Sequence, residues 1–178
     1  MLFCRRNLVY GDYDFVFNVV KPPYVLVATG DYHDGYLLRF GDLFLQDEEI
    51  YFVPTYNVAQ FRSAISQAIE LGLPIIFINL HRLFTVEKFH ELNNAIYPLL
   101  NDYEEAVFMT TKPMSSKDYP PKPYAPHYVR HLSDVVVFSR KVRGGYSVYV
   151  VKHPHLPYVK VFMGDRYGAK LSIYKSLA

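Results

Sequence analysis

The sequence predicts an α/β domain with a mostly parallel central sheet, helices on its faces and antiparallel strands at the C-terminal end. In the first two thirds of the chain, apolar runs such as 73–78 alternate with stretches of helical spacing, which is typical of parallel strands joined by helices. After residue 134, strand-like runs follow one another directly, and Arg143-Gly144-Gly145 is a turn signal between two of them. This order predicts a parallel sheet that is extended by antiparallel strands.

The first half of the chain is divided by prolines and glycines. The pair in Lys21-Pro22-Pro23 ends the first segment, because proline removes a backbone donor and restricts the residue before it. Pro54 is expected to stop a strand for the same reason, and Gly72 to end a helix. The predicted elements are an N-terminal strand or arm within 1–23, with its strand at 8–20, then a buried strand at 24–28, a short helix at 36–45, a strand at 50–53, a helix at 58–71 and a strand at 73–78.

The second half opens with a helix predicted over 85–99, for which Thr85 is the expected N-cap. A long loop follows inside the domain, and loops of that length are usually functional. The remaining predicted elements are a strand at 106–109, the basic and aromatic loop within 110–127, a helix at 127–132, and strands at 135–138, 146–151, 159–163 and 171–174.

Size and composition fit a single domain over residues 1–178 and exclude several classes of protein. Half of the residues are apolar, so the chain can bury a substantial core. The net charge of +2 leaves only local cationic clusters for contact with nucleic acid. A lone Cys4 excludes an intrachain disulfide framework and a cysteine zinc site. No apolar run approaches the roughly 20 residues that span a bilayer, so we expect a cytoplasmic protein that does not enter a membrane.

Gly30 and Gly35 stand at the spacing of a nucleotide-binding P-loop, after the predicted strand at 24–28. In a working loop, backbone N–H groups hold phosphates, a lysine neutralises them and a hydroxyl contacts Mg²⁺. Here Tyr36 and Leu37 occupy the lysine and hydroxyl positions. The pattern predicts a loop that keeps the backbone turn without the phosphate chemistry. The alternative is that the two glycines merely end turns.

The late part of the chain carries the motifs of a known family. Residues 133–141 read S-D-V-V-V-F-S-R-K before the Arg143-Gly144-Gly145 turn, and residues 154–157 read P-H-L-P. The segment 55–65 adds a looser match. On these motifs the chain resembles the ATPase core of the RecA/RadA recombinase family, in particular a short archaeal RadA-like paralog, from residue 24 to 163. The resemblance implies a RecA-like P-loop NTPase core.

The catalytic positions that the resemblance identifies have all changed. Besides Tyr36 and Leu37 in the Walker A motif, Asn79 replaces the Walker B aspartate. Tyr56 stands near the place of the glutamate that activates water. An amide cannot supply the negative charge that helps to hold Mg²⁺. The resemblance therefore implies that the chain does not hydrolyse ATP, is not an enzyme, and holds no metal or other cofactor.

The loop within 110–127 lies where the family has its second DNA-binding loop. It combines cations for phosphates with aromatic rings for unstacked bases. The alternative is a proline-stiffened surface loop whose lysines are merely solvated. A second basic group, Arg140, Lys141 and Arg143, is interpreted as the solvated face of a turn. The predicted nucleic-acid-binding residues are Lys112, Lys117, Tyr119, Lys122, Tyr124, His127 and Arg130.

Three functions are compatible with these patterns. The first is a non-catalytic RadA-like paralog that binds single-stranded DNA, a RadA-type recombinase or further copies of itself, and so modulates homologous recombination or DNA repair. The second is a protein-interaction or assembly module with a RecA-like fold that does not bind nucleic acid. The third, ranked last, is an enzyme that uses Asp31, His33 and Asp34 for acid–base chemistry.

Overall fold

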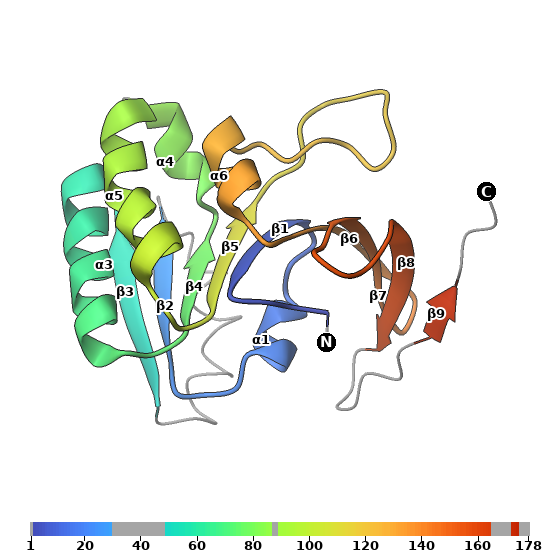
Figure 1. Cartoon of the computed structure of the whole chain (residues 1–178), viewed down its shortest axis with the longest axis horizontal. Helices are drawn as coiled ribbons and strands as arrows, with labels where there is room; N and C mark the ends of the chain where they lie inside the picture. Colours follow the sequence, from blue (N-terminus) through green and yellow to red (C-terminus); the bar gives the residue numbers. More distant parts are fainter. Residues whose placement is uncertain (1, 30–48, 87–88, 165–171, 175–178) are drawn as a thin grey trace.

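The computed structural model describes residues 2–29, 49–86, 89–164 and 172–174, which form one mixed sheet with helices packed against it (Figure 1). Within these residues the sheet has nine strands in the order β3-β2-β4-β5-β1-β6-β7-β8-β9. The strands are β1 Arg6–Gly11, β2 Tyr24–Thr29, β3 Ile50–Thr55, β4 Ile75–Ile78, β5 Val107–Thr111, β6 Val135–Val142, β7 Gly145–Lys152, β8 Val159–Gly164 and β9 Ser172–Tyr174. The helices are α1 Val16–Val19, α3 Val58–Leu71, α4 His81–Val86, α5 Phe89–Asp102 and α6 His127–Leu132.

The sheet is parallel from β3 to β6 and antiparallel from β6 to β9. The predicted α/β class, with antiparallel strands at the C-terminal end, is therefore confirmed. The hairpin of β6 and β7 turns at Arg143-Gly144, as the glycine pair indicated. Because its two strands are joined directly, this hairpin extends the sheet without a crossover helix.

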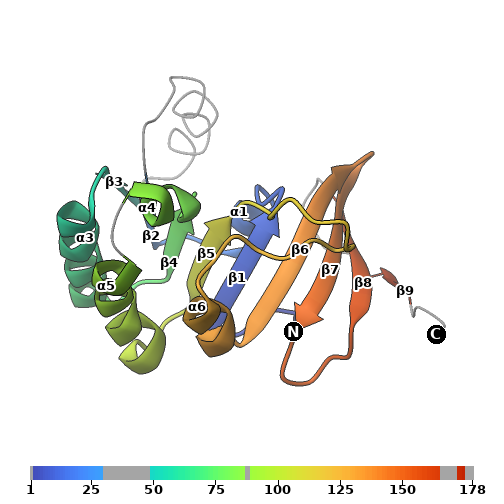
Figure 2. The ribbon, with the colours of Figure 1, turned by 90° about the horizontal axis from the view of Figure 1, so that it is seen from above.

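Two hydrophobic cores lie on opposite faces of the sheet, and alternate residues of β1 contribute to each. Leu8 and Tyr10 belong to the core under α3, α5 and α6. Val9 belongs to the other core, which contains Phe15 and Val16 at the start of α1. Figure 2 shows α3, α5 and α6 along one side of the sheet. Since both faces of β1 are covered, this strand lies at the centre of the domain.

Local signals predicted two helices correctly. Helix α3 spans the expected residues and ends at Gly72, which adopts the left-handed conformation (φ 63°). Asn57 caps its start by accepting a hydrogen bond from the Gln60 N–H. Helix α6 also has the expected bounds. The Lys152 Nζ donates to carbonyl oxygens at the C-terminal end of α6, including that of His131 at 2.7 Å.

Three expectations about the elements were wrong. The N-terminal strand, expected at 8–20, is β1 at Arg6–Gly11, and the helix α1 follows it. This strand lies inside the sheet, because Arg6 pairs with Val107 and Asn7 with Val135, across about 100 residues or more. Strand β3 continues through Pro54, since an edge strand tolerates a residue without a donor. Thr85 lies inside α4 rather than at an N-cap, because a separate short helix precedes α5.

Candidate functional site

The candidate site lies where the strand connections diverge, at the carboxyl ends of the parallel strands. The chain leaves β1 through α1, on one face of the sheet. It leaves the neighbouring β5 toward α6, on the opposite face. Adjacent strands whose connections part in this way leave a crevice outside their carboxyl ends, where α/β proteins bind ligands. The topology therefore places a binding crevice between the ends of β1 and β5.

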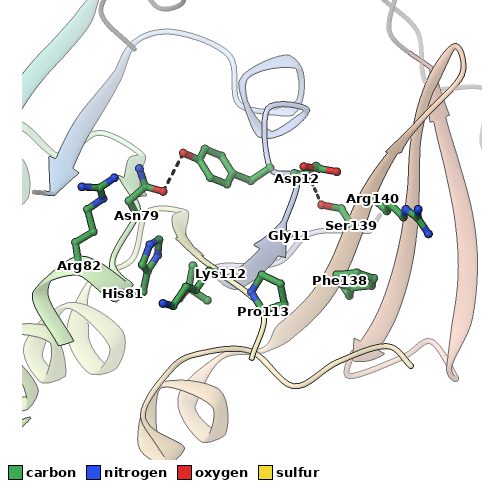
Figure 3. A pocket seen from close by; sticks show the side chains of 12 residues that line it. Gly11, Asp12, Asn79, His81, Arg82, Lys112, Pro113, Phe138, Ser139 and Arg140 are labelled. Carbon is green, nitrogen blue, oxygen red and sulfur yellow. Dashed lines mark hydrogen bonds between the residues drawn. The ribbon is translucent and has the colours of Figure 1, made fainter. Parts of the chain in front are cut away.

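A pocket of about 510 Å³ occupies this crevice (Figure 3). Its walls come from the segments that follow β1, β4 and β5 and from the middle of β6. The lining residues are Gly11, Asp12, Tyr13, Asn79, His81, Arg82, Thr111, Lys112, Pro113, Phe138, Ser139 and Arg140. These segments are far apart in the sequence, so the pocket is a product of the strand order.

The β1 end of the pocket is built around Gly11. Its φ of +95° is a conformation that other residues rarely adopt, and a Cβ there would lie 2.1 Å from the Ser139 carbonyl oxygen. This close approach lets the Asp12 N–H donate to the same oxygen at 3.0 Å. The Asp12 carboxylate accepts from the Lys141 N–H at 2.6 Å. The carboxylate is thus directed to β6, and β1 and β6 are fastened together at the pocket.

Asn79 marks the β4 end of the pocket, and its polar groups are used to hold that end in place. Its Oδ1 accepts from the Tyr13 hydroxyl at 3.1 Å, and its N–H donates to Thr110 Oγ1 at 3.0 Å. Its carbonyl oxygen accepts from Thr29 Oγ1 at 2.6 Å. Asn79 also has a φ of 58°, in the left-handed region that asparagine tolerates better than most residues. Asn79 therefore joins β1, β2, β4 and β5 at this edge of the sheet.

The charge of the pocket is predominantly positive. Arg82, Lys112 and Arg140 line it, against the single carboxylate of Asp12. Figure 3 shows Arg82 and Arg140 at opposite ends, with Lys112 between them. This order follows the strands, since Arg82 lies in α4 just after β4, Lys112 follows β5, and Arg140 belongs to β6. A row of cations with one carboxylate, itself bound to β6, favours an anionic ligand.

His81 adds a neutral imidazole to this pocket. Burial, together with the nearby charges of Lys112 and Arg82, lowers its pKa to about 4. Its Nδ1 is a buried atom without a hydrogen-bond partner in the described part of the chain. His81 therefore remains uncharged near pH 7, and it can contribute one donor or acceptor to a ligand.

The predicted loop folds back on itself beside the pocket. Its two legs pair through hydrogen bonds from the Met114 N–H to the Lys122 carbonyl at 2.7 Å and from the Tyr124 N–H to the Lys112 carbonyl at 2.9 Å. Thr111 Oγ1 secures the base by donating to the Tyr124 carbonyl at 2.6 Å. Figure 2 shows the loop leaving β5 and reaching across β1 to β6 and β7. The loop is thus an ordered excursion over the carboxyl edge of the sheet.

One of the predicted binding residues, Lys112, lines the pocket, and Tyr119, Lys122 and Tyr124 belong to the same loop. The Lys112 Nζ lies 4.8 Å from the centre of the Tyr124 ring, in a cation–π contact. Tyr119 is 58% exposed and packs edge-on against Phe138, with 5.7 Å between ring centres. Lys122 is exposed on the returning leg of the loop. These placements keep cations and rings side by side along the loop.

The other three predicted binding residues lie outside the pocket. Lys117 is exposed in the loop, and His127 is exposed at the start of α6, where it stacks on His131 with 6.1 Å between ring centres. Arg130 is half-buried on α6, and its carbonyl oxygen accepts from Lys152. The structure therefore groups Arg130 with α6 and the start of β6 rather than with the carboxyl edge.

Lys112 is the one lining residue that was predicted to bind nucleic acid, and the other basic side chains of the described lining, His81, Arg82 and Arg140, were not. His81 and Arg82 directly follow β4, and polar residues after a parallel strand were the signal that could have found them. Arg140 belongs to the basic group interpreted as a solvated turn, but the structure brings it to the pocket. Lys141 and Arg143, the other members of that basic group, are not among the lining residues, and the Lys141 Nζ lies over the Tyr146 ring.

The predicted degenerate nucleotide loop, with Gly30, Gly35, Tyr36 and Leu37, and the helix expected at 36–45 lie outside the described residues. That predicted loop follows β2, whereas the described pocket lies beside the end of β1, with no lining residue from β2. The strand at which the connections diverge is β1 and not β2. Among the described residues, no group of three or more histidine, cysteine or acidic residues has the arrangement of a metal site.

Comparisons with known proteins identify no family for this chain. No protein-family model matches it, and no curated protein matches it significantly. In the part of the chain with assigned positions, no helix is long and apolar enough to cross a bilayer.

Proposed function

We propose that this chain is a non-catalytic RecA-like protein that binds single-stranded DNA along the carboxyl edge of its sheet and thereby modulates DNA recombination or repair. The observation that carries the proposal is the convergence of Arg82, Lys112 and Arg140 on one pocket, beside a loop that adds two lysines and two tyrosines. Phosphates require such cations, and unpaired bases require such rings.

The proposed RecA-like identity is supported by the arrangement of the motifs that carry the resemblance. Residues 133–141 enter β6, the Arg143-Gly144 turn leads to β7, and Pro154-His155-Leu156-Pro157 connects β7 to β8. The loop after β5 reaches over the sheet edge, as a DNA-binding loop of this family would. The sheet order and these motifs agree with the resemblance, which remains our proposal.

The non-catalytic part of the proposal is supported by the side chains at the pocket. No lysine, serine or threonine occurs from Gly11 to Val20, the segment that forms the β1 side. The amide of Asn79 is engaged by Tyr13 and carries no charge for Mg²⁺. Lysine, hydroxyl and carboxylate groups are the parts that phosphoryl transfer requires. The β1 side of the pocket therefore lacks the lysine and the serine or threonine hydroxyl, and position 79 lacks the carboxylate. The lysine of the pocket, Lys112, follows β5 instead, and the Asp12 carboxylate accepts from the Lys141 N–H.

Direct binding measurements test this function. We expect a fluorescein-labelled oligothymidylate of 20 nucleotides to bind with a large rise in anisotropy at low salt, and a duplex of the same length to bind more weakly. We expect isothermal titration with Mg²⁺ and ATP to show no binding in the micromolar range. Absence of single-strand binding at low salt would refute the nucleic-acid proposal, and tight Mg²⁺–ATP binding would refute its non-catalytic part.

A second candidate function is assembly with a recombinase or with another copy of the chain. Strand β3 is the last strand at its end of the described sheet, and Tyr51 on it is 48% exposed. Exposed sheet edges are common sites of strand addition. Sedimentation of the purified chain tests self-assembly, and loss of the larger species in Tyr51→Lys would support this edge as the contact.

A further inference from the structure

The antiparallel part of the sheet has one face on which cations and aromatic rings alternate. We call it the β6–β8 face and define it as Arg140, Ser147, Tyr149, Lys160 and Phe162. In one row across the strands, Phe138 pairs with Tyr149 and Tyr149 with Lys160. In the next row, Arg140 pairs with Ser147 and Ser147 with Phe162. Residues paired in this way project on the same side of a sheet.

This face is not covered by the described helices. Helix α6 is the last of them along this side, and Figure 2 shows β7 and β8 extending past it. A hollow of about 610 Å³ lies on the face, lined by Val142, Ser147, Lys160 and Phe162. The opposite side of the same strands is closed, because Val148, Val150 and Val161 belong to a buried core.

The rings at the face are grouped around Tyr149, which is itself half-buried. Tyr149 lies 5.9 Å from Phe138 and 5.2 Å from Tyr119 between ring centres. The Lys160 Nζ lies 5.1 Å from the centre of the Tyr149 ring. Tyr158, which directly precedes β8 and stands two residues before Lys160, is 52% exposed. Aromatic side chains held in place by a sheet can stack bases at little entropic cost.

The charge of the face identifies the kind of ligand it favours. Strands β6, β7 and β8 contain no aspartate or glutamate, whereas they contain Arg140, Lys141, Lys152 and Lys160. Two of these cations, Arg140 and Lys160, flank the rings on the face itself. A surface that offers rings and only positive charge complements a strand with unpaired bases and phosphates.

The face is also continuous with the pocket at the carboxyl edge. Phe138 and Arg140 line that pocket and belong to the same strand as the face. Tyr119, at the tip of the loop, contacts Phe138 from the pocket side and Tyr149 from the face side. A strand that leaves the pocket past Tyr119 would reach the β6–β8 face next.

We propose that the β6–β8 face is a stacking platform for unpaired bases, on which Tyr149, Tyr158 and Phe162 contact bases and Lys160 and Arg140 contact the adjoining phosphates. This inference rests on the proposed binding of single-stranded DNA and adds a second contact surface to it. The pocket and loop supply most of the charge, and the platform supplies recognition of bases.

A comparison of base-bearing and abasic strands tests the platform. Affinities are measured for an oligothymidylate and for a strand of the same length whose central nucleotides lack bases, with the wild-type chain and with Tyr149→Leu/Tyr158→Leu. We expect the wild type to prefer the base-bearing strand, and the double variant to lose about five- to 150-fold of that preference for each base no longer stacked. Binding of the abasic strand is expected to stay within twofold, because the variant keeps every cation.

The control is Tyr97→Leu, which removes a hydroxyl and a ring that is 53% exposed on α5. It is expected to keep the full preference. If Tyr149→Leu/Tyr158→Leu also keeps the preference for the base-bearing strand, the platform is refuted. That result would be expected if the face binds an acidic protein. If the wild type binds neither strand, the proposed function itself fails.

A charge reversal supplies a test that does not depend on the folding of the tyrosine variant. Lys160→Glu is expected to weaken binding of both strands by at least fivefold, because a like charge would face the phosphates. Lys21→Glu, at an exposed position before β2, is the control and is expected to change affinity less than twofold. Equal effects of the two reversals would overturn the placement of phosphates at Lys160.

Discussion

The salt dependence of oligonucleotide binding measures how many cations of the site contact phosphates. Five cations line the pocket or lie along the loop: Arg82, Lys112, Lys117, Lys122 and Arg140. Each phosphate neutralised on a single strand contributes about −0.7 to the slope of log affinity against log salt. If all five contact phosphates, the slope is about −3.5, and affinity falls roughly 130-fold between 50 and 200 mM salt.

Removing the three loop lysines tests this count. Lys112→Ala/Lys117→Ala/Lys122→Ala leaves two contacts, so the expected slope is about −1.4 and the loss over the same salt range is roughly sevenfold. The two legs of the loop pair through backbone atoms, for example from Met114 to Lys122, so the substitutions leave those hydrogen bonds in place. The lost interactions are the charges and one cation–π contact of Lys112 with Tyr124.

The assay is fluorescence anisotropy of an oligothymidylate at four or more salt concentrations. The control, Arg5→Ala/Lys21→Ala/Arg62→Ala, removes the same net charge from exposed or half-buried sites that do not line the pocket. We expect the control to keep the wild-type slope. Equal slopes for the loop variant and the wild type would show that the loop lysines do not contact phosphates, and equal losses in both variants would show that only net charge matters.

Three further predictions concern stability. Gly11→Ala should lower the melting temperature more than Gly144→Ala. Both glycines have positive φ, but of the two only a Cβ at Gly11 would meet a backbone carbonyl, at 2.1 Å. The expected extra loss of unfolding free energy is about 1–3 kcal/mol by thermal unfolding, and equal losses in the two variants would contradict it. As pH falls from 6.5 to 4, the free energy of unfolding should decrease by up to about 3 kcal/mol more in the wild type than in His81→Gln. The reason is that His81 binds a proton in the unfolded chain over this range, whereas its pKa of about 4 in the folded chain keeps it neutral. Urea titrations that show the same pH dependence for both proteins would refute this. Phe61→Ala removes a fully buried ring and should lower the free energy of unfolding by about 3–5 kcal/mol in urea titrations. Ile69→Ala, at a 39% exposed site of the same helix, should lower it much less.

Phe61 illustrates which inferences the sequence supported well. Its helical spacing indicated a position in the core, and its ring packs against Phe77 with 5.3 Å between centres. Helix α3, helix α6 and the β6–β7 hairpin were also predictable, because caps, turns and apolar periodicity act within a few residues. The basic and aromatic character of the loop was visible for the same reason.

The site itself was only partly predictable. The sequence identified Lys112 and Tyr124, which the structure brings together. It did not identify His81, Arg82 or Arg140 as members of the pocket, because each becomes a neighbour of Lys112 only through the order of the strands. The position of Asn79 after β4 was predicted correctly, while its hydrogen bonds to Tyr13 and Thr110 depend on that order as well.

By itself, the sequence determined helices α3 and α6, the β6–β7 hairpin, and the loop that concentrates charge and aromatic rings. Only the tertiary structure decided that the N-terminal segment is the central strand and that a pocket opens beside it. The physical reason is that propensity and capping depend on neighbours along the chain, whereas the pairing of β1 with β5 and β6 joins residues about 100 or more positions apart. No local pattern specifies such a pairing.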